Sequence, residues 1–143
     1  MFGWASNGDI YFGDGGNLVR MSTDGNYKST LLTEPSAQII QPIGCPGGEY
    51  IVFVWANHTA SKQVNVWRVN TDGSNPTQLT NGIADVGQSC SPDGRWVYYE
   101  DLNSLEVKKV AVDGGTAEVV PGSALPSGYF IVPPVGVSPD GKL

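Results

Sequence analysis

The chain has 143 residues, with 8 Lys and Arg against 14 Asp and Glu and a formal net charge of −6, which favours a single domain and argues against nucleic-acid binding. Its longest apolar stretch, residues 50–56, is far shorter than the ~20 residues of a membrane span, and residues 1–20 lack the basic and apolar regions of a signal peptide. We therefore expect neither a membrane span nor a signal peptide in this chain. Its 19 glycines and 10 prolines disfavour long helices.

Short segments rich in β-branched and aromatic residues predict strands along the whole chain. No stretch of ten residues has the 3.6-residue apolar period of an amphipathic helix, so the predicted fold class is all-β. In chain order, the expected strands are 2–5, 9–12, 18–21 and 29–32, then 39–44, 50–55, 64–69 and 77–80, then 86–90, 96–100, 105–112 and 118–120, and finally 130–137.

Two turn markers recur between these strands. The first begins at positions 6, 45, 91 and 138, at intervals of 39, 46 and 47 residues, and reads Ser-Pro-Asp-Gly at 91–94 and 138–141. The second is an Asp-Gly pair at 24–25, 72–73 and 113–114. A period of about 40–50 residues with several strands per unit is typical of β-propeller blades. We predict three four-stranded blades, at about 2–38, 39–85 and 86–128, and an extra inner strand at about 129–137.

The repeats resemble those of a known family. Ser-Pro-Asp-Gly-Arg-Trp-Val-Tyr-Tyr at 91–99, and the run from Val66 to Gly82 with its Thr-Asp-Gly turn, are similar to the TolB-like six-bladed propeller repeat. They also look like the C-terminal propeller of bacterial receptor-type Ser/Thr protein kinases, which would make the parent domain extracytoplasmic. The resemblance covers the whole chain, but the repeated residues form turns and cores and do not specify a function.

Three blades form an open arc, and its two end faces would expose more apolar surface than a soluble monomer tolerates. We therefore expect two copies to close a six-bladed ring as a homodimer with twofold symmetry, the commonest closed symmetry. An excised fragment that assembles loosely is the alternative.

Strand alternation predicts that the loops between second and third strands share one face with the loops between blades. This face is irregular in sequence, whereas the opposite face consists of repeated turns, so we expect ligands on the irregular face or in the channel. Its candidate ligand-binding residues are Asp14, Glu34, Asn57, His58, Lys62, Asp85, Asp101 and Asn103.

Catalytic and metal-binding residues are weakly indicated. His58, the only histidine, and Asp85 are candidates for acid–base chemistry, although His58 in a polar loop is more typical of a solvated residue. No Gly-x-Ser-x-Gly elbow is present, so the peptidases that carry similar propellers transfer no catalytic residue. Asp14, Asp85 and Asp101 are candidate ligands for Ca²⁺ or Zn²⁺, but scattered surface acids are usually only solubilising.

Cys45 and Cys90 both fall at the ends of predicted inner strands, one position apart in the repeat. Because side chains alternate along a strand, we expect the two thiols to point to opposite faces and to remain free and buried. The four tryptophans, at 4, 55, 67 and 96, all lie in predicted strands. We expect them to fill the space between blades, with a role as stacking platforms for a sugar or peptide as the alternative.

Two functions follow as hypotheses. The first is a non-catalytic propeller scaffold that binds a protein, peptide or small ligand. The second is a metal-assisted hydrolase of an ester, lactone or phosphotriester, with its site at the channel mouth. Loss of activity on chelation would favour the enzyme, and binding without turnover would favour the scaffold.

Overall fold

The computed structural model describes residues 2–4, 8–59, 62–126 and 137–140 of the chain. Its twelve strands form three antiparallel four-stranded sheets, and the described residues contain no helix. The all-β prediction is confirmed. In each sheet the strands are hydrogen-bonded in chain order, so every sheet is a simple meander. No helix in the described residues is long and apolar enough to cross a membrane.

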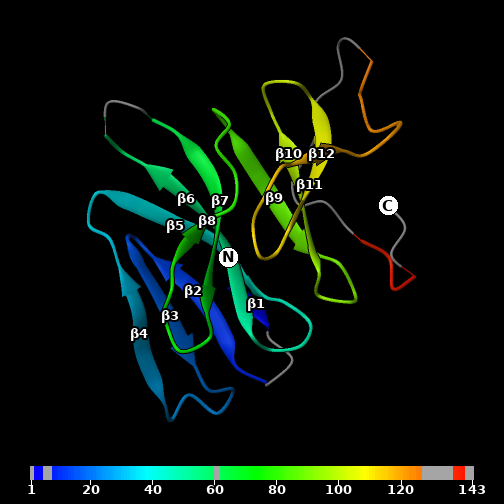
Figure 1. Ribbon diagram of the computed structural model, residues 1–143. Coiled ribbons are helices and arrows are strands. Elements are labelled where there is room, and N and C mark those ends of the chain that lie inside the picture. The colour runs from blue at the N-terminus through cyan, green and yellow to red at the C-terminus, as the bar shows by residue number, and fades with distance from the viewer. Residues whose placement is uncertain (1, 5–7, 60–61, 127–136, 141–143) are drawn as a thin grey trace.

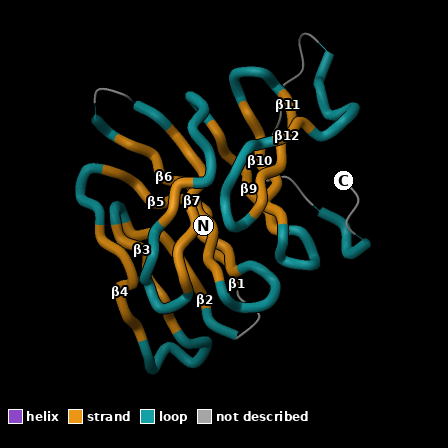
Figure 2. Tube along the Cα trace, in the orientation of Figure 1, coloured by secondary structure: helices purple, strands orange, loops and turns teal. Residues whose placement is uncertain are grey.

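The sheets lie side by side with the second in the middle, as Figures 1 and 2 show. We call them blades 1, 2 and 3. Blade 1 comprises β1 (Phe2–Trp4), β2 (Ile10–Asp14), β3 (Asn17–Met21) and β4 (Lys28–Thr33); blade 2 comprises β5 (Ala37–Gly44), β6 (Tyr50–Asn57), β7 (Val64–Asn70) and β8 (Thr77–Gln78); blade 3 comprises β9 (Asp85–Cys90), β10 (Trp96–Asp101), β11 (Glu106–Ala111) and β12 (Glu118–Val119). The extra inner strand predicted at 129–137 lies outside the described residues, apart from Val137.

The repeated turn markers have a common physical basis. In the β9–β10 turn, the Ser91 hydroxyl donates to Asp93 and accepts the main-chain N–H of Trp96, and Asp93 also accepts the N–H of Arg95. Gly94 follows with a φ of 70°, a conformation that residues with a Cβ resist. Ser22 and Asp24 make the same contacts in the β3–β4 turn. The Ser-x-Asp-Gly marker is therefore a self-capped hairpin turn.

Blades 1 and 2 pack closely through an apolar core. The buried side chains are Tyr11, Leu18, Ile39, Ile51, Phe53 and Val69, and the tilted rings of Trp55 and Trp67, with centroids 4.6 Å apart, extend this core. Glycine permits the close approach, because a Cβ at Gly13 would overlap the carbonyl oxygen of Ile39, and one at Gly16 would overlap that of Glu34. We call this contact the closed interface.

Blades 2 and 3 pack through a second core, which we call the open interface. Its buried side chains are smaller on average: Cys45, Val52, Val66, Leu79, Val97, Tyr99, Val110 and Val112. Polar links supplement it, among them one from Gln88 on β9, whose amide donates to the carbonyl oxygen of Gln41 at 2.5 Å. Another joins Asn65 to Asp85, at the opposite end of the strands.

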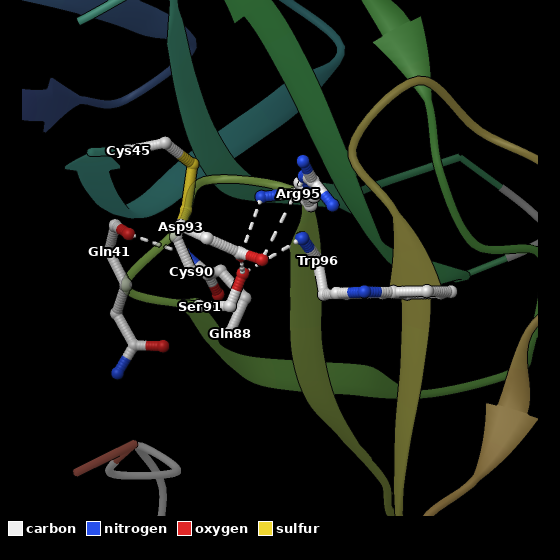
Figure 3. The surroundings of a disulfide bond; sticks show 8 residues. All are labelled: Gln41, Cys45, Gln88, Cys90, Ser91, Asp93, Arg95 and Trp96. Atoms are coloured by element: carbon white, nitrogen blue, oxygen red, sulfur yellow. Dashed lines mark hydrogen bonds and ion pairs between the residues drawn. A yellow bond between two sulfur atoms is a disulfide. The ribbon is translucent and has the colours of Figure 1, made fainter. Parts of the chain in front are cut away.

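The expectation of free thiols is wrong, because Cys45 and Cys90 form a disulfide across the open interface, with their Cα atoms 5.5 Å apart (Figure 3). The alternation argument correctly placed the two thiols on opposite faces of their sheets. It failed because the cysteines lie on successive blades, and one face of blade 2 packs against the opposite face of blade 3. Opposite faces are therefore what a bridge between neighbouring blades requires.

The tryptophans divide between two environments. Trp55 and Trp67 pack against the closed interface, as expected for residues that fill space between blades. Trp96 lies on the face of blade 3 that points away from blade 2, with the ammonium of Lys109 4.4 Å from its ring centroid. The side chain of Trp4 lies outside the described part of the chain.

Candidate functional site

The predicted irregular face exists, and main-chain hydrogen bonds join its loops. The N–H of Glu34, between blades 1 and 2, donates to Gly16 in the β2–β3 hairpin. His58, after β6, donates its N–H to Ser36, and Leu102, after β10, donates to Ala84. Each loop between blades therefore contacts the hairpin of a neighbouring blade. We call this surface the loop face, and the opposite surface the turn face.

Asp85 is the most buried candidate on the loop face, with 1% of its surface exposed. Its Oδ2 accepts the N–H of Gly82 at 2.8 Å and the side-chain amide of Asn65 at 3.2 Å. The Asn65 amide also donates to the carbonyl oxygen of Gly82. The Asp85 carboxylate thus fixes the loop that connects blades 2 and 3, and this structural role explains why it is buried.

Asp101, 8% exposed, is paired with Asp85 across β9 and β10 and forms a second buried polar centre. Its Oδ2 lies 2.6 Å from the Lys108 ammonium, and its Oδ1 accepts the N–H groups of Asn103 and Ser104. Burial alone would raise the pKa of Asp101, but these hydrogen bonds outweigh it and hold the pKa below its ordinary value. Asp101 is therefore an ionised cap of the β10–β11 hairpin.

The electrostatics of this region follow from burial and from the two carboxylates. Burial raises the pKa of the Tyr99 hydroxyl to about 12, and the negative charges of Asp85 and Asp101 add to the effect. The hydrogen bond to Asp101 raises the pKa of Lys108. Tyr99 and Lys108 therefore keep their protons at neutral pH, and neither is poised as a general base.

The remaining candidates are dispersed over the loop face. Asp14 is exposed at the end of β2 on blade 1. The Glu34 carboxylate accepts the N–H and hydroxyl of Ser36, which lowers its pKa. The Asn57 side chain accepts the N–H of Thr59, and His58 is exposed beside it. Lys62 is exposed with a φ of 45°, and Asn103 contributes its N–H to the Asp101 cap.

The candidate metal ligands do not meet. Asp85 and Asp101 are register neighbours within blade 3, whereas Asp14 lies on blade 1. Among residues 2–4, 8–59, 62–126 and 137–140, no group of three or more His, Cys, Asp and Glu side chains could hold a metal ion. Because the oxygens of Asp85 and Asp101 are also engaged by N–H groups and Lys108, this set does not fit a Ca²⁺ or Zn²⁺ site.

A cleft of about 650 Å³ lies at the other end of the open interface, on the turn face. It is much larger than the hollow of about 80 Å³ that Trp55, Asn65 and their neighbours form near the loop face, and it falls within the usual size range of ligand pockets. We call it the turn-face cleft. It is lined by Pro46, Gly47, Glu49, Tyr50, Asp93, Gly94, Arg95, Trp96, Ala111, Val112 and Asp113.

Three carboxylates and one guanidinium line the turn-face cleft, so its local charge is negative. The Tyr50 hydroxyl donates to Asp113 at 3.3 Å, which links blades 2 and 3 across the cleft. The guanidinium of Arg68 lies 4.4 Å from the Tyr50 ring centroid. Hydrogen bonds from Ser91 and Arg95 lower the pKa of Asp93, so that carboxylate is ionised at neutral pH.

Sequence reasoning missed this cleft because it treated the repeated turns as uniform scaffolding. The differences between the repeats held the available signal. Glu49 and Tyr50 stand where the next repeat has Arg95 and Trp96. The charged and aromatic side chains at this position are the signal in the sequence that could have directed attention to the turn face.

The comparisons with known proteins are structural. No protein-family model matches the chain, and no curated protein matches it in sequence. Among solved structures, the putative TolB from Agrobacterium tumefaciens is 23% identical with a TM-score of 0.68, over 83% of this chain and 48% of its own. TolB from Acinetobacter baumannii is 12% identical with a TM-score of 0.65, over 82% and 31%.

A gluconolactonase from Xanthomonas campestris is 17% identical with a TM-score of 0.59, over 81% of this chain and 45% of its own. This chain thus spans less than half the length of each of the three proteins. Identities this low establish a common fold and leave the function open. The chain therefore has the fold of a TolB-like β-propeller, of which it forms three blades.

Proposed function

We propose that the chain is a non-catalytic binding module, and that its turn-face cleft receives a positively charged, extended peptide segment. The observation that carries the proposal is the cleft itself. It combines the volume of a ligand site with the carboxylates of Glu49, Asp93 and Asp113 and the ring of Tyr50. Carboxylates and aromatic rings attract Lys and Arg side chains, through charge and through cation–π contact.

The loop face supports binding in preference to catalysis. Asp85 and Asp101 use their oxygens to fix loops, and Tyr99 and Lys108 keep their protons at neutral pH. The loop-face residues remain a proposed second surface for a partner.

The disulfide supports a location outside the cytoplasm, because structural disulfides persist in oxidising compartments. In a longer protein, such a module would act as the sensor or interaction part. The receptor-kinase propellers that the repeats resemble are the model for this arrangement.

A titration with labelled peptides tests the proposal. We expect a Lys- and Arg-rich peptide to bind in a salt-dependent way, and a Glu-rich peptide of equal length not to bind. Glu49→Lys should weaken binding at least tenfold, because it reverses a charge in the cleft. Glu118→Lys, the same charge change at an exposed site on the outer strand of blade 3, should leave affinity unchanged. Equal binding of both peptides, or equal loss in both variants, would contradict the proposal.

The alternative, a metal-assisted hydrolase, has a fold neighbour with lactonase activity by name. Its test is turnover of a lactone, an aryl ester and a phosphotriester, with and without Ca²⁺ or Zn²⁺. Metal-dependent turnover abolished by Asp85→Asn, in a variant that keeps its stability, would favour the enzyme over the binding module.

A further inference from the structure

A second pocket of the open interface lies toward the outer edge of blades 2 and 3, and the proposed peptide site does not use it. It has a volume of about 330 Å³. Residues 78–81, at the end of β8 and just after it, form its wall on blade 2. Tyr99 of β10, together with Gly115 and Ala117 shortly before β12, forms its wall on blade 3. We call it the outer-edge pocket, and it shares no lining residue with the turn-face cleft.

The fold itself holds both walls of this pocket in place. The N–H groups of Leu79 and Thr80 donate to the carbonyl oxygen of Val66 on β7, and the Thr80 hydroxyl accepts the N–H of Val66 at 3.0 Å. The Gln78 side-chain amide donates to the carbonyl oxygen of Thr80 at 2.7 Å. On the opposite wall, Tyr99 belongs to the apolar core of the open interface. Because these contacts exist without a ligand, binding requires little further ordering of the walls.

Two hydroxyl groups of the outer-edge pocket retain unused hydrogen-bonding capacity. Tyr99 and Thr80 are each 4% exposed. Within the described part of the chain the Tyr99 hydroxyl makes no hydrogen bond, yet it is not sealed from solvent, so it reaches the surface where Tyr99 lines the pocket. The Thr80 hydroxyl accepts one hydrogen bond and can still donate another. A hydroxyl in so buried a residue is costly to leave unpaired, so water or a ligand must bind it.

The outer-edge pocket is polar but uncharged. Gln78 and Asn81 add exposed amide groups at its rim. None of the described residues that line it carries a charge at neutral pH, because the pKa of Tyr99 is raised to about 12. Asp85 and Asp101 lie near enough to act on Tyr99, so their charges would repel an anion, whereas a cation would meet no carboxylate among these lining residues. The chemistry therefore favours a neutral ligand that both donates and accepts hydrogen bonds.

We propose that the outer-edge pocket binds a neutral sugar ring. Sugar hydroxyls donate and accept, which matches the hydroxyl and amide groups of the two walls. Leu79 and Ala117 supply apolar surface for the C–H groups of the ring. The volume of the pocket is at the small end of the range for ligand sites, which favours a single ring over an extended chain. This site is additional to the proposed peptide cleft, and it gives the open interface a second ligand.

An NMR titration of the isotope-labelled chain tests the proposal. The probes are three neutral sugars, methyl glucoside, methyl galactoside and N-acetylglucosamine, and two charged ones, glucuronate and glucosamine. We expect at least one neutral sugar to shift the side-chain amide signals of Gln78 and Asn81 in a saturable way, and the charged sugars to cause no such shift. The absence of a saturable shift with all three neutral sugars, or equal shifts with the charged ones, would overturn the proposal.

Three variants locate the sugar in the pocket. Tyr99→Phe removes only the hydroxyl, so sugar binding should weaken about fivefold, the effect of one lost hydrogen bond, with no loss of stability in urea unfolding. Ala117→Trp should fill the pocket and abolish binding, whereas Thr116→Trp, at an exposed residue outside the lining, should bind as the parent chain does. Unchanged affinity in Tyr99→Phe, or equal effects of the two Trp substitutions, would contradict the assignment. Peptide binding in the turn-face cleft should persist in all three variants, so the two proposals can fail separately.

Discussion

The closed and open interfaces join identical types of blade in different ways. At the closed interface, large side chains and two glycines bring blades 1 and 2 into close contact. At the open interface, mainly small residues form the core, a disulfide and buried polar groups link the blades, and a cleft remains at the turn face. The difference shows how a repeat fold acquires a site. Blades 1 and 2 pack tightly along their interface, whereas a disulfide holds blades 2 and 3 together beside a cleft.

Removal of the disulfide from the open interface should cause the largest loss of stability. We expect the Cys45→Ser, Cys90→Ser double variant to lose about 3–4 kcal/mol of unfolding free energy, because the bridge closes a loop with a sequence separation of 45 residues. Urea unfolding of the parent chain and the variant, without reductant, measures the loss. Equal stability of the two proteins would mean that the open interface does not depend on the bridge.

A methyl group at Gly13 should disrupt the closed interface. Gly13→Ala would push the new Cβ into the carbonyl oxygen of Ile39, and we expect a loss of about 2–3 kcal/mol in unfolding free energy. Gly15→Asn is the matched control, since Gly15 has a φ of 59°, open space around it and a hairpin position that Asn favours. If both variants are equally stable in urea unfolding, blades 1 and 2 are not in close contact.

Ionisation of Glu100 should make the free energy of unfolding depend on pH, with a smaller effect than either of the two changes above. Burial raises the pKa of Glu100 from 4.5 to about 7, so the folded chain holds this proton more tightly than the unfolded chain. Stability is therefore full below pH 4.5 and falls as the pH rises toward 7, by a loss on the order of 2 kcal/mol. The lowered pKa values of Asp24, Asp72 and Asp93 act in the opposite direction, at lower pH.

Thermal unfolding between pH 5 and pH 8 measures this loss, with Glu100→Gln as the comparison. The variant cannot ionise at this position and should show a flatter profile than the parent chain. Parallel profiles for the two proteins would place Glu100 in contact with water.

The sequence predicts the fold well because local chemistry determines it. Ser-x-Asp-Gly turns cap themselves, and the residues on either side alternate as strands do, so blades follow from short segments alone. The loop face was likewise predictable, and Asp85 and Asp101 do lie together on it. Their structural use was not, because it depends on Asn65 and Lys108, which approach only in the folded sheets.

The cysteines and the turn-face cleft could not be predicted for a related reason. Both depend on how one blade faces the next, whereas alternation within a strand describes only a single sheet. Cys45 and Cys90 meet across two sheets, and Tyr50 and Asp113 face each other across the same junction. Their pairing depends on the spacing between blades, which no local pattern encodes.

Amide hydrogen exchange with and without reductant tests most directly whether the two interfaces are held by different means. We predict that reduction accelerates exchange in the turns at 45–50 and 90–96, beside the disulfide, and leaves β2, β3 and their contacts with β5 unchanged. Exchange that is insensitive to reductant, or that rises equally in all three blades, would contradict the account.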